Sequence, residues 1–263
     1  MNQSSYIILG AGASGLLLAY RMSLDSYFDD KSILIIDQVK DKGNDKTWCY
    51  WEEGEGEWDE LLTKKWPKVF FGSKDFTETL NISPYSYKMI RSEKFYHKLW
   101  RSIELKSNIT FVEDSVKTYT EIDNRVKVVT NKSTYFGLKL LNSILDKTVY
   151  ETQQKYPVLQ QHFVGWFVKI KTDCFDDSIA TFMDFNIPQN GNTRFMYVLP
   201  IDKNIALFEY TLFSKDLLEH SEYEEAIKDY LKEKKITDFE ILEKENGAIP
   251  MTSFKFEELN SYN

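Results

Sequence analysis

The sequence predicts an α/β protein that contains one parallel and one antiparallel sheet, and three observations support this. Tyr6–Leu9 is a short apolar strand that leads into a glycine-rich turn and then into a helix at Leu16–Met22. Ile33–Asp37 is a second strand, and its apolar run is typical of a parallel sheet that is covered on both faces. After Pro157, short strand-like runs are separated by polar breakers, which indicates an antiparallel sheet.

Composition places the chain among ordinary globular proteins. It has 263 residues, of which 42% are hydrophobic and 28% charged, enough for one large domain or two interleaved ones. The net charge of -8 argues against nucleic-acid binding, which normally needs a basic face. The two cysteines are far apart and the three histidines lack metal-ligand spacing. We therefore predict no disulfide framework and no metal site, and we expect a reducing, cytoplasmic environment.

The first half of the chain is expected to continue the α/β pattern. Residues 92–105 have a helical pattern, whereas the polar, glycine-punctuated stretch from Lys40 to Gly56 is predicted to be a loop. Ile109–Val116 and Arg125–Thr130 are predicted to pair as strands across a polar turn at Asp123-Asn124.

The second half is expected to form the antiparallel sheet and one helix. Ser221 is a good N-cap with Glu224 three residues later, and an apolar helix face follows. That face carries Tyr223, Ile227, Tyr230 and Leu231. The predicted strands are Gly165–Lys171, Ile179–Phe185, Arg194–Leu199 and Ile205–Leu212.

The glycine-rich turn carries a dinucleotide-binding pattern. Gly10, Gly12 and Gly15 have the spacing G-x-G-x-x-G between a strand and a helix. The first allows a tight turn, the second lets the backbone approach a pyrophosphate, and the third permits close helix–strand packing. The helix N-terminus offers N–H groups and a positive dipole to the phosphates. Asp37 ends the second strand, where a carboxylate accepts hydrogen bonds from a ribose.

The position of this turn near the N-terminus favours FAD over NAD(P), because N-terminal FAD domains are built in this way. The alternative is a glycine-rich turn without a ligand, but the combination of strand, turn, helix, strand and acid favours nucleotide binding. The predicted fold is therefore α/β, with a Rossmann-type FAD-binding domain and an antiparallel-sheet substrate domain.

Two features between residues 46 and 92 have both a structural and a functional interpretation. Lys46–Trp51 is a dense aromatic cluster in a polar stretch. It could form a small core for its own loop, or a wall beside a flavin or an apolar substrate. Arg91 could pair with cofactor phosphates or could be an ordinary solvated arginine.

Two carboxylates lie in the middle of apolar strands. Strand alternation puts Glu209 on one face together with Leu207 and Thr211. Burial would disfavour the ionised form of Glu209 and raise its pKa, which suits a general acid. Asp184 has a similar position on its own strand. Alternatively, each carboxylate pairs with Arg194 or a lysine and only stabilises the fold.

These motifs, in this order, resemble those of the lycopene beta-cyclase family of FAD proteins, and the similarity covers nearly the whole chain. The glycine turn is shared with many flavoproteins, whereas the segment His162–Trp166 and the Glu209 strand are more specific. The matching stretches are the glycine turn, Thr47–Trp51, Met89–Ser92, Leu141–Ser143, Gln161–Trp166, Met183–Asp184, Arg194–Pro200, Phe208–Thr211 and Gly247–Met251.

The resemblance implies an enzyme that closes beta-ionone rings at the ends of lycopene, or of a similar linear carotenoid, to give beta-carotene. This is a proton-initiated isomerisation without net redox change that needs reduced FAD, with NADPH as the electron source. Glu209 matches the family's essential acidic motif and is the first choice for the acid and base, and Asp184 is the second. The polyene substrate, together with the lack of a run of about 20 apolar residues, implies peripheral docking on a membrane surface.

The resemblance also suggests how the chain is divided. Residues 1–60 and 91–150 are expected to form the FAD-binding domain, and residues 61–90 and 151–250 the substrate-binding domain. Family members continue into a glycine-rich stretch that completes the FAD site, whereas this chain ends at Asn263. We therefore expect the C-terminal completion of the FAD domain to be missing.

Two other interpretations stay open. Another flavoenzyme of this fold, such as an FAD-dependent monooxygenase or a prenyl reductase, would change the redox state of its substrate, whereas a cyclase would not. An inactive truncated remnant or binding module would have no such chemistry.

Overall fold

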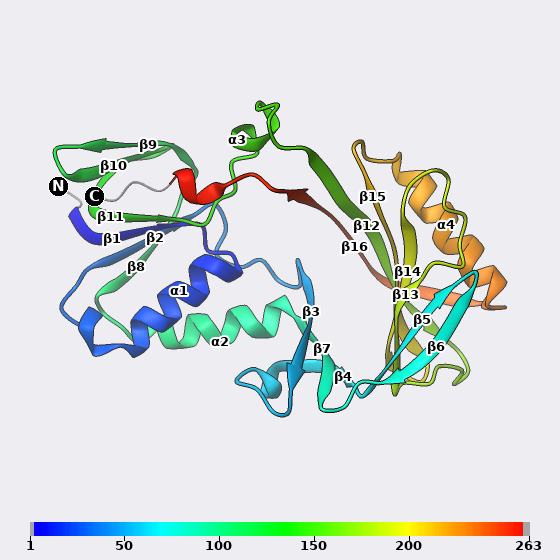
Figure 1. The fold of residues 1–263 in the computed structure, drawn as a ribbon. Coiled ribbons are helices and arrows are strands. Elements are labelled where there is room, and N and C mark those ends of the chain that lie inside the picture. The colour runs from blue at the N-terminus through cyan, green and yellow to red at the C-terminus, as the bar shows by residue number, and fades with distance from the viewer. Residues whose placement is uncertain (1–2, 260–263) are drawn as a thin grey trace. The chain divides into compact units, whose positions relative to one another are not determined.

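The chain folds into two compact units in the computed structural model, which describes residues 3–259 (Figure 1). Within those residues, unit 1 takes in 3–45, 92–149 and 255–259, and unit 2 takes in 46–91 and 150–254. Neither unit is therefore one continuous stretch of sequence. The short helix α3 (Thr148–Glu151) spans the point where the chain leaves unit 1 for the second time.

Unit 1 is built on a six-stranded sheet with the strand order β8-β2-β1-β11-β10-β9. The predicted parallel pair is confirmed, because β1 pairs in parallel with β2, and β8 and β11 extend the parallel part on either side. The strands are β1 (Gln3–Leu9), β2 (Ile33–Asp37), β8 (Ile109–Glu113), β9 (Val116–Ile122), β10 (Arg125–Thr130) and β11 (Thr134–Asn142).

Two helices lie side by side on this sheet (Figure 1), α1 (Ala13–Leu24) and α2 (Ser92–Glu104). The side chains of Ser23 and Ser102 meet between them, with 3.2 Å separating the two Oγ atoms. The apolar face of α2 is buried. Two short 3-10 turns also belong to unit 1, Ser26–Phe28 and Phe256–Leu259.

The hairpin at the edge of this sheet differs from the sequence prediction. The strand that pairs with β10 across Asp123 and Asn124 is β9, not Ile109–Val116. Both turn residues have positive φ, 49° and 59°, as a tight two-residue hairpin requires. The strand immediately before such a turn must therefore be the partner. Residues 109–113 instead pair in parallel with β2.

Unit 2 contains a seven-stranded sheet with the order β16-β12-β15-β14-β13-β5-β6. The prediction of an antiparallel sheet is confirmed, except that β13 and β5 pair in parallel. The strands are β5 (Lys68–Ser73), β6 (Phe76–Asn81), β12 (Val158–Ile170), β13 (Ile179–Asp184), β14 (Arg194–Asp202), β15 (Ile205–Ser214) and β16 (Phe239–Thr252).

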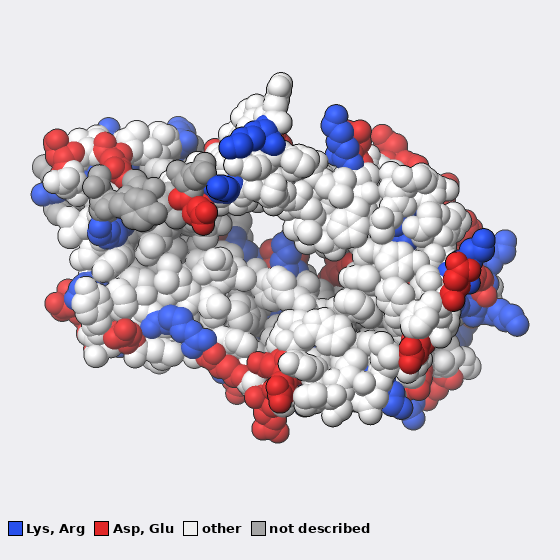
Figure 2. Space-filling view, in the orientation of Figure 1, with Lys and Arg blue, Asp and Glu red and all other residues white. Residues whose placement is uncertain are grey.

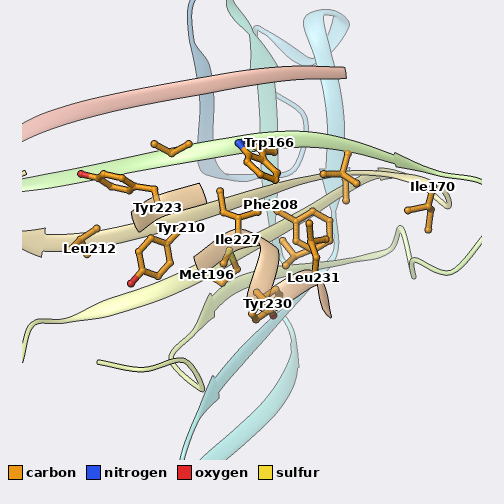
Figure 3. Close-up of a cluster of buried hydrophobic side chains, with 14 residues drawn as sticks. Trp166, Ile170, Met196, Phe208, Tyr210, Leu212, Tyr223, Ile227, Tyr230 and Leu231 are labelled. Atoms are coloured by element: carbon orange, nitrogen blue, oxygen red, sulfur yellow. The ribbon is translucent and has the colours of Figure 1, made fainter. Parts of the chain in front are cut away.

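One face of the large sheet is covered by helix α4 (His220–Glu233), as Figures 1 and 3 show. Tyr223, Ile227, Tyr230 and Leu231 are buried, so the predicted apolar face is confirmed. The predicted N-cap, Ser221, was wrong. Glu219 is the N-cap, because its side chain and that of Glu222 form a reciprocal capping box.

A separate three-stranded sheet in unit 2 corrects the loop that was predicted from Lys40 to Gly56. Its strand order is β3-β7-β4, with β3 at Thr47–Glu53, β7 at Tyr85–Arg91 and β4 at Leu62–Trp66. A 3-10 turn at Asp59–Leu61 precedes β4. The alternating aromatic residues of β3 suit a pleated strand, and this outweighs the polar flanks. Pairing of β3 with β7 also moves the unit boundary, so residues 46–60 and Arg91 lie in unit 2.

Charged side chains of both signs are dispersed over the face that is drawn in Figure 2. Across residues 3–259, no helix combines the length and the apolar character that a membrane crossing would need.

Candidate functional site

The glycine turn of unit 1 is locked between strands and helix. Gly10 has φ +91°, and a Cβ there would come within 2.5 Å of Ser143 Oγ. A Cβ on Gly15 would collide with the carbonyl oxygen of Gly10. Ser143 Oγ donates to the carbonyl of Leu9 at 2.7 Å. These contacts explain why glycine stands at the first and third positions of the pattern, and they make Ser143 the residue that holds the turn against β11.

Gly12 differs from the other two glycines, because a Cβ built on it meets nothing within 4 Å. It is the N-cap of α1, and no side chain caps the helix. The first N–H groups of a helix have no partner inside it. The open space at Gly12 therefore adjoins donors that suit an anion.

Asp37 stands beside this turn at the end of β2. Its Oδ2 accepts the Ala11 N–H at 2.5 Å, and its Oδ1 accepts Lys42 Nζ at 2.9 Å and the Val39 N–H at 3.1 Å. Burial raises the pKa of Asp37, but these hydrogen bonds outweigh burial and lower the pKa overall. The turn therefore offers an ionised acceptor together with open backbone donors. This donor set fits the ribose and pyrophosphate of a dinucleotide such as FAD.

In unit 2, strand register lines up a row of side chains on the large sheet. Tyr197 on β14, Glu209 on β15, Gly165 on β12 and Glu245 on β16 are direct partners in successive strands. Directly opposed residues share one face. We call the face that carries Tyr197, Glu209 and Glu245 the carboxyl face. It is the opposite face from the one that α4 covers, because Leu207 and Phe208 belong to different cores.

Gly165 leaves a gap in this row between the two glutamates. A Cβ there would come within 2.9 Å of Leu207 Cδ1, 3.1 Å of Glu245 Cγ and 3.4 Å of Glu245 Oε1. The side chain of Glu245 therefore extends over Gly165, towards β15.

The two glutamates are hydrogen-bonded to each other and to hydroxyl groups. Thr211 donates to Glu209 Oε1 at 2.9 Å, and Thr47 donates to Glu245 Oε2 at 2.7 Å. Glu245 acts on Glu209 through its charge and through a side-chain hydrogen bond, and both favour the protonated form of Glu209.

Burial is the first reason for the protonated state. Burial, the charge of Glu245 and the hydrogen bond to Glu245 raise the pKa of Glu209 to about 8, and only Thr211 opposes them. Burial also raises the pKa of Glu245, although Thr47 and Arg91 work in the other direction. A carboxyl group that is neutral near pH 7 can act as a general acid. The sequence-based expectation of a raised pKa at Glu209 is thus confirmed.

Aromatic rings connect the small sheet to the carboxyl face. Ring centroids are 4.9 Å apart for Trp51 and Tyr87, 5.4 Å for Tyr87 and Phe182, 5.9 Å for Phe182 and Tyr197, and 5.0 Å for Tyr197 and Phe195. The faces of such rings attract positive charge. A site of this kind suits a cationic reaction intermediate.

The aromatic cluster at Lys46–Trp51 supplies part of this wall. In β3, Thr47, Cys49 and Trp51 are spaced to share one face. Thr47 reaches Glu245, and Trp51 lies against Tyr87. Burial, followed by the charge of Glu209, raises the pKa of the Cys49 thiol. The face of β3 that carries Thr47 and Cys49 therefore lies beside the two carboxyl groups.

Arg91 also contacts residues of the carboxyl face within unit 2. Its Nη2 donates to Glu243 Oε1 at 2.5 Å, and its guanidinium lies 4.3 Å from the ring centroid of Phe167. Its side chain is only 12% exposed, so it is not the solvated arginine that one interpretation expected. Its Nε is buried and has no hydrogen-bond partner in the described part of the chain.

Asp184 lies on the other face of the large sheet. The Tyr230 hydroxyl of α4 donates to its Oδ2 at 2.7 Å, and the Asn186 N–H and Nδ2 both donate to its Oδ1 at 3.0 Å. Lys234 Nζ lies 3.6 Å from Oδ2. The structure therefore does not bring Asp184 and Glu209 together, and the contacts of Asp184 anchor α4 to the sheet.

Three residues of these sites were missed by sequence reasoning: Ser143, Gly165 and Glu245. Glu245 lies in β16, which was not predicted as a strand. Its signal is the alternation of half-buried residues from Phe239 to Gly247, which is hidden in the sequence because charged residues occupy both faces.

Several solved structures have the same fold. A geranylgeranyl bacteriochlorophyll reductase-like protein from Thermoplasma acidophilum aligns with a TM-score of 0.69 and 9% identity, over 95% of this chain and 66% of that protein. A flavin-dependent brominase aligns with a TM-score of 0.65 and 13% identity, over 95% and 68%. A flavoprotein/dehydrogenase from Cytophaga hutchinsonii gives 0.58 and 12%, over 94% and 66%. The chain thus spans about two thirds of these flavoprotein folds, and such low identities speak only for the fold.

Comparison with curated protein sequences gives no significant match. In contrast, a family model described as lycopene cyclase protein matches residues 6–260. The match includes the glycine turn, the strand of Glu209 and the strand of Glu245. Since it extends over nearly the whole sequence, the chain belongs to the lycopene cyclase protein family.

Proposed function

We propose that this protein closes beta-ionone rings at the ends of lycopene, or of a similar linear carotenoid, and that Glu209 is the acid that starts the reaction. The observation that carries the proposal is the position of the Glu209 carboxyl group opposite Tyr197 and beside an aromatic wall, in a chain of the lycopene cyclase family.

The reaction needs one proton at its start and releases one at its end. Glu209 would give its proton to the terminal double bond of the polyene, which forms a C–H bond and leaves a carbocation. The neighbouring alkene attacks that cation and closes the ring, and loss of a ring proton to a base completes an isomerisation with no net redox change. Water would quench the cation, so a dry aromatic site is required. Rings such as Tyr197 would also stabilise the positive charge.

The cofactor in this proposal is FAD, bound at the glycine turn of unit 1. Gly12 and the N-terminus of α1 would hold the pyrophosphate, and Asp37 would hold a ribose. Reduced FAD, with NADPH as the source of its electrons, would supply an electron-rich ring that stabilises positive charge. Because Arg91 is already paired with Glu243, we propose the turn and Asp37, rather than Arg91, as the principal cofactor contacts.

Glu209→Gln tests the acid. The amide keeps the shape of the side chain but has no acidic proton, so ring formation should fall by at least the roughly 10²–10⁴-fold that a positioned acid contributes. The assay is a lycopene-accumulating host scored for red lycopene against orange beta-carotene, with flavin content measured on the same protein. Glu240→Gln, an exposed change in β16, is the matched control.

Wild-type ring formation by Glu209→Gln would refute the proposal. A product whose mass differs from that of lycopene would do so as well. Higher mass by one oxygen would indicate a monooxygenase, and added hydrogen would indicate a reductase.

Gly12→Val tests the cofactor site. The branched side chain would fill the open space at Gly12 and obstruct the pyrophosphate. We expect purified protein to lose its yellow colour and its bound flavin, while thermal unfolding changes little. A normal flavin-to-protein ratio in the folded variant would rule out the turn as the binding site.

A membrane-dissolved polyene has to be reached from the membrane surface, and we therefore propose peripheral association. Fractionation of lycopene-containing cells should recover the protein with membranes and release it at high pH or high salt. Recovery of all the protein in the soluble fraction would contradict this.

A further inference from the structure

Cyclisation needs a group that keeps Glu209 in its acid form and a route that brings the proton back after each turnover. Three observations identify a candidate on β16: the strand register, the gap at Gly165 and the hydrogen bond that Thr47 gives to Glu245. We propose that Glu209 and Glu245 share one proton across Gly165. In the catalytic cycle, which rests on the function proposed above, Glu245 takes up the proton released by ring closure and returns it to Glu209.

The register places the two glutamates on either side of Gly165. Gly165 is the direct partner of Glu209 on one side and of Glu245 on the other. Carboxyl groups two strands apart do not normally touch, because the side chain of the middle strand separates them. Glycine removes that side chain, and Glu245 Cγ lies 3.1 Å from the position that a Cβ would take.

The surroundings fix which oxygen atoms remain for the shared proton. On Glu209, Oε1 accepts from Thr211, and on Glu245, Oε2 accepts from Thr47. Each carboxyl group is thus held in orientation by one hydroxyl and has its other oxygen for the partner. Two neighbouring carboxyl groups that are held in this way share one proton, because a second negative charge beside the first is strongly disfavoured.

The other polar groups near Glu209 and Glu245 determine which of the two carboxyl groups is ionised. Tyr87 of β7, Tyr197 of β14 and Cys49 of β3 all have a raised pKa, with burial as the first cause, and so they stay neutral near pH 7. The charged groups are Arg91 of β7, Glu243 of β16 and Lys46, each of which acts on Glu245. Arg91 and Lys46 favour the ionised form of Glu245, whereas the charge of Glu243 opposes it. Because the hydrogen bond from Thr47 also favours the ionised form of Glu245, we assign the resting proton to Glu209.

The proton cycle balances without any other reactant. Glu209 gives a proton to the polyene and becomes a carboxylate. The cyclic cation loses a ring proton, which Glu245 accepts. The hydrogen bond between the two carboxyl groups then carries a proton from Glu245 to Glu209, and both return to their starting states.

The first test needs neither flavin nor substrate. Infrared difference spectra of wild type minus Glu209→Gln, recorded from pH 5 to pH 9, report the C=O band of the protonated Glu209 carboxyl group. In Glu245→Gln, loss of the neighbouring charge should move the titration midpoint down by at least about one pH unit. Glu245→Asp keeps the charge on a shorter side chain, so its midpoint should lie between the two. Glu240→Gln should titrate as wild type does.

Circular dichroism on the same samples confirms that each variant is folded. If Glu245→Gln does not fold, Glu245→Asp and Gly165→Ala carry the test, because Gly165→Ala should also lower the midpoint by pushing Glu245 away. A midpoint that is unchanged in the folded variants would overturn the proposal.

The second test is the pH profile of ring formation in membranes with added lycopene. The alkaline limit of activity in Glu245→Gln should move down together with the infrared midpoint, and turnover should drop by about 10-fold or more. An unchanged rate and pH profile, with a shifted infrared midpoint, would overturn the role of Glu245 in proton return. If the infrared midpoint shifts as expected but the wild-type protein does not cyclise lycopene, the proposed function is refuted. The shared proton between Glu209 and Glu245 would still be supported.

Discussion

The two faces of the large sheet in unit 2 each hold acidic side chains, with Asp184 buried on one face and Glu209 half-buried on the other, but the partners of these groups differ. On the face under α4, Asp184, Arg194 and His162 each meet a complementary partner. Asp184 accepts from Tyr230, Arg194 donates to Tyr210 at 3.0 Å, and His162 Nδ1 lies 2.5 Å from the Tyr223 hydroxyl. Around these pairs lies the apolar cluster of Figure 3. On the carboxyl face, Glu209 has one hydroxyl donor and a second carboxyl group.

This difference distinguishes a carboxylate that stabilises the fold from a carboxyl group that can transfer a proton. A buried carboxylate that is surrounded by donors contributes to stability and has no reason to change its protonation. A buried carboxyl group that faces another acid keeps a proton that it can give away. Asp184 and Glu209 both belong to mainly apolar strands, and it is their hydrogen-bond partners that distinguish the two groups.

The largest expected effect is on the packed face. Phe208, 1% exposed, lies in the cluster of Figure 3 between Phe175 and Tyr230. Phe208→Ala should lower the free energy of unfolding by about 3–5 kcal/mol, measured by denaturant titration. Phe76→Ala, in the same sheet but 51% exposed, should cost less than about 1 kcal/mol. Equal losses would mean that the α4 face is not the main core of unit 2.

A smaller effect is expected at Asp184. Asp184→Asn should cost about 1–3 kcal/mol, because Tyr230 loses a charged acceptor. Ring formation per folded molecule should stay near the wild-type rate, in contrast to Glu209→Gln. Combining Asp184→Asn with Tyr230→Phe should cost less than the sum of the two single changes. Strictly additive costs, or a red lycopene-accumulating host with folded Asp184→Asn protein, would contradict a purely structural role.

The smallest effect concerns the pH dependence of stability on the carboxyl face. The pKa of Glu209 rises from 4.5 in its ordinary state to about 8 in the folded protein, so the folded state binds more protons than the unfolded chain between these values. This contribution to stability is complete below about pH 4.5 and is lost as the pH rises through about 8. Between pH 6 and pH 7 it should change by about 1.4 kcal/mol.

Glu209→Gln should remove that slope, so the variant should gain stability relative to wild type between pH 6 and pH 7. Urea titrations of both proteins at the two pH values measure this, with Glu240→Gln as the control. A constant difference between wild type and Glu209→Gln would show that the folded state holds no extra proton there.

The parts of the molecule that could be predicted from sequence have local signals. The turn at Gly10, the strands before and after it, and the two faces of β15 follow from spacing within a dozen residues. The raised pKa of Glu209 also follows, because a carboxyl group in an apolar strand is desolvated wherever that strand is buried. These features could be predicted without knowing which segments pack against them in the folded protein.

The rest depends on which strands become neighbours. Glu245 meets Glu209 only because β16 and β15 flank β12, and no pattern inside β16 specifies that order. The separation of Asp184 from Glu209 has the same cause, since the register of β13 is shifted between Thr181 and Asp184. The alternation in Thr47–Trp51 was visible, but polar flanking residues outweighed it in the loop prediction.

The interleaved connectivity has a consequence for how the protein is made. Ile7 of β1 pairs with Leu140 of β11, and residues 46–91 of unit 2 are synthesised between them. Because translation adds roughly 5–20 residues per second, β11 is synthesised on the order of ten seconds after β1. During that time the apolar residues of β1 have one parallel partner at most, and pairings so distant in sequence form slowly. We therefore expect the nascent chain to depend on chaperones that bind apolar segments, and ribosome-bound fragments that end before residue 140 to resist proteases poorly in the region of β1.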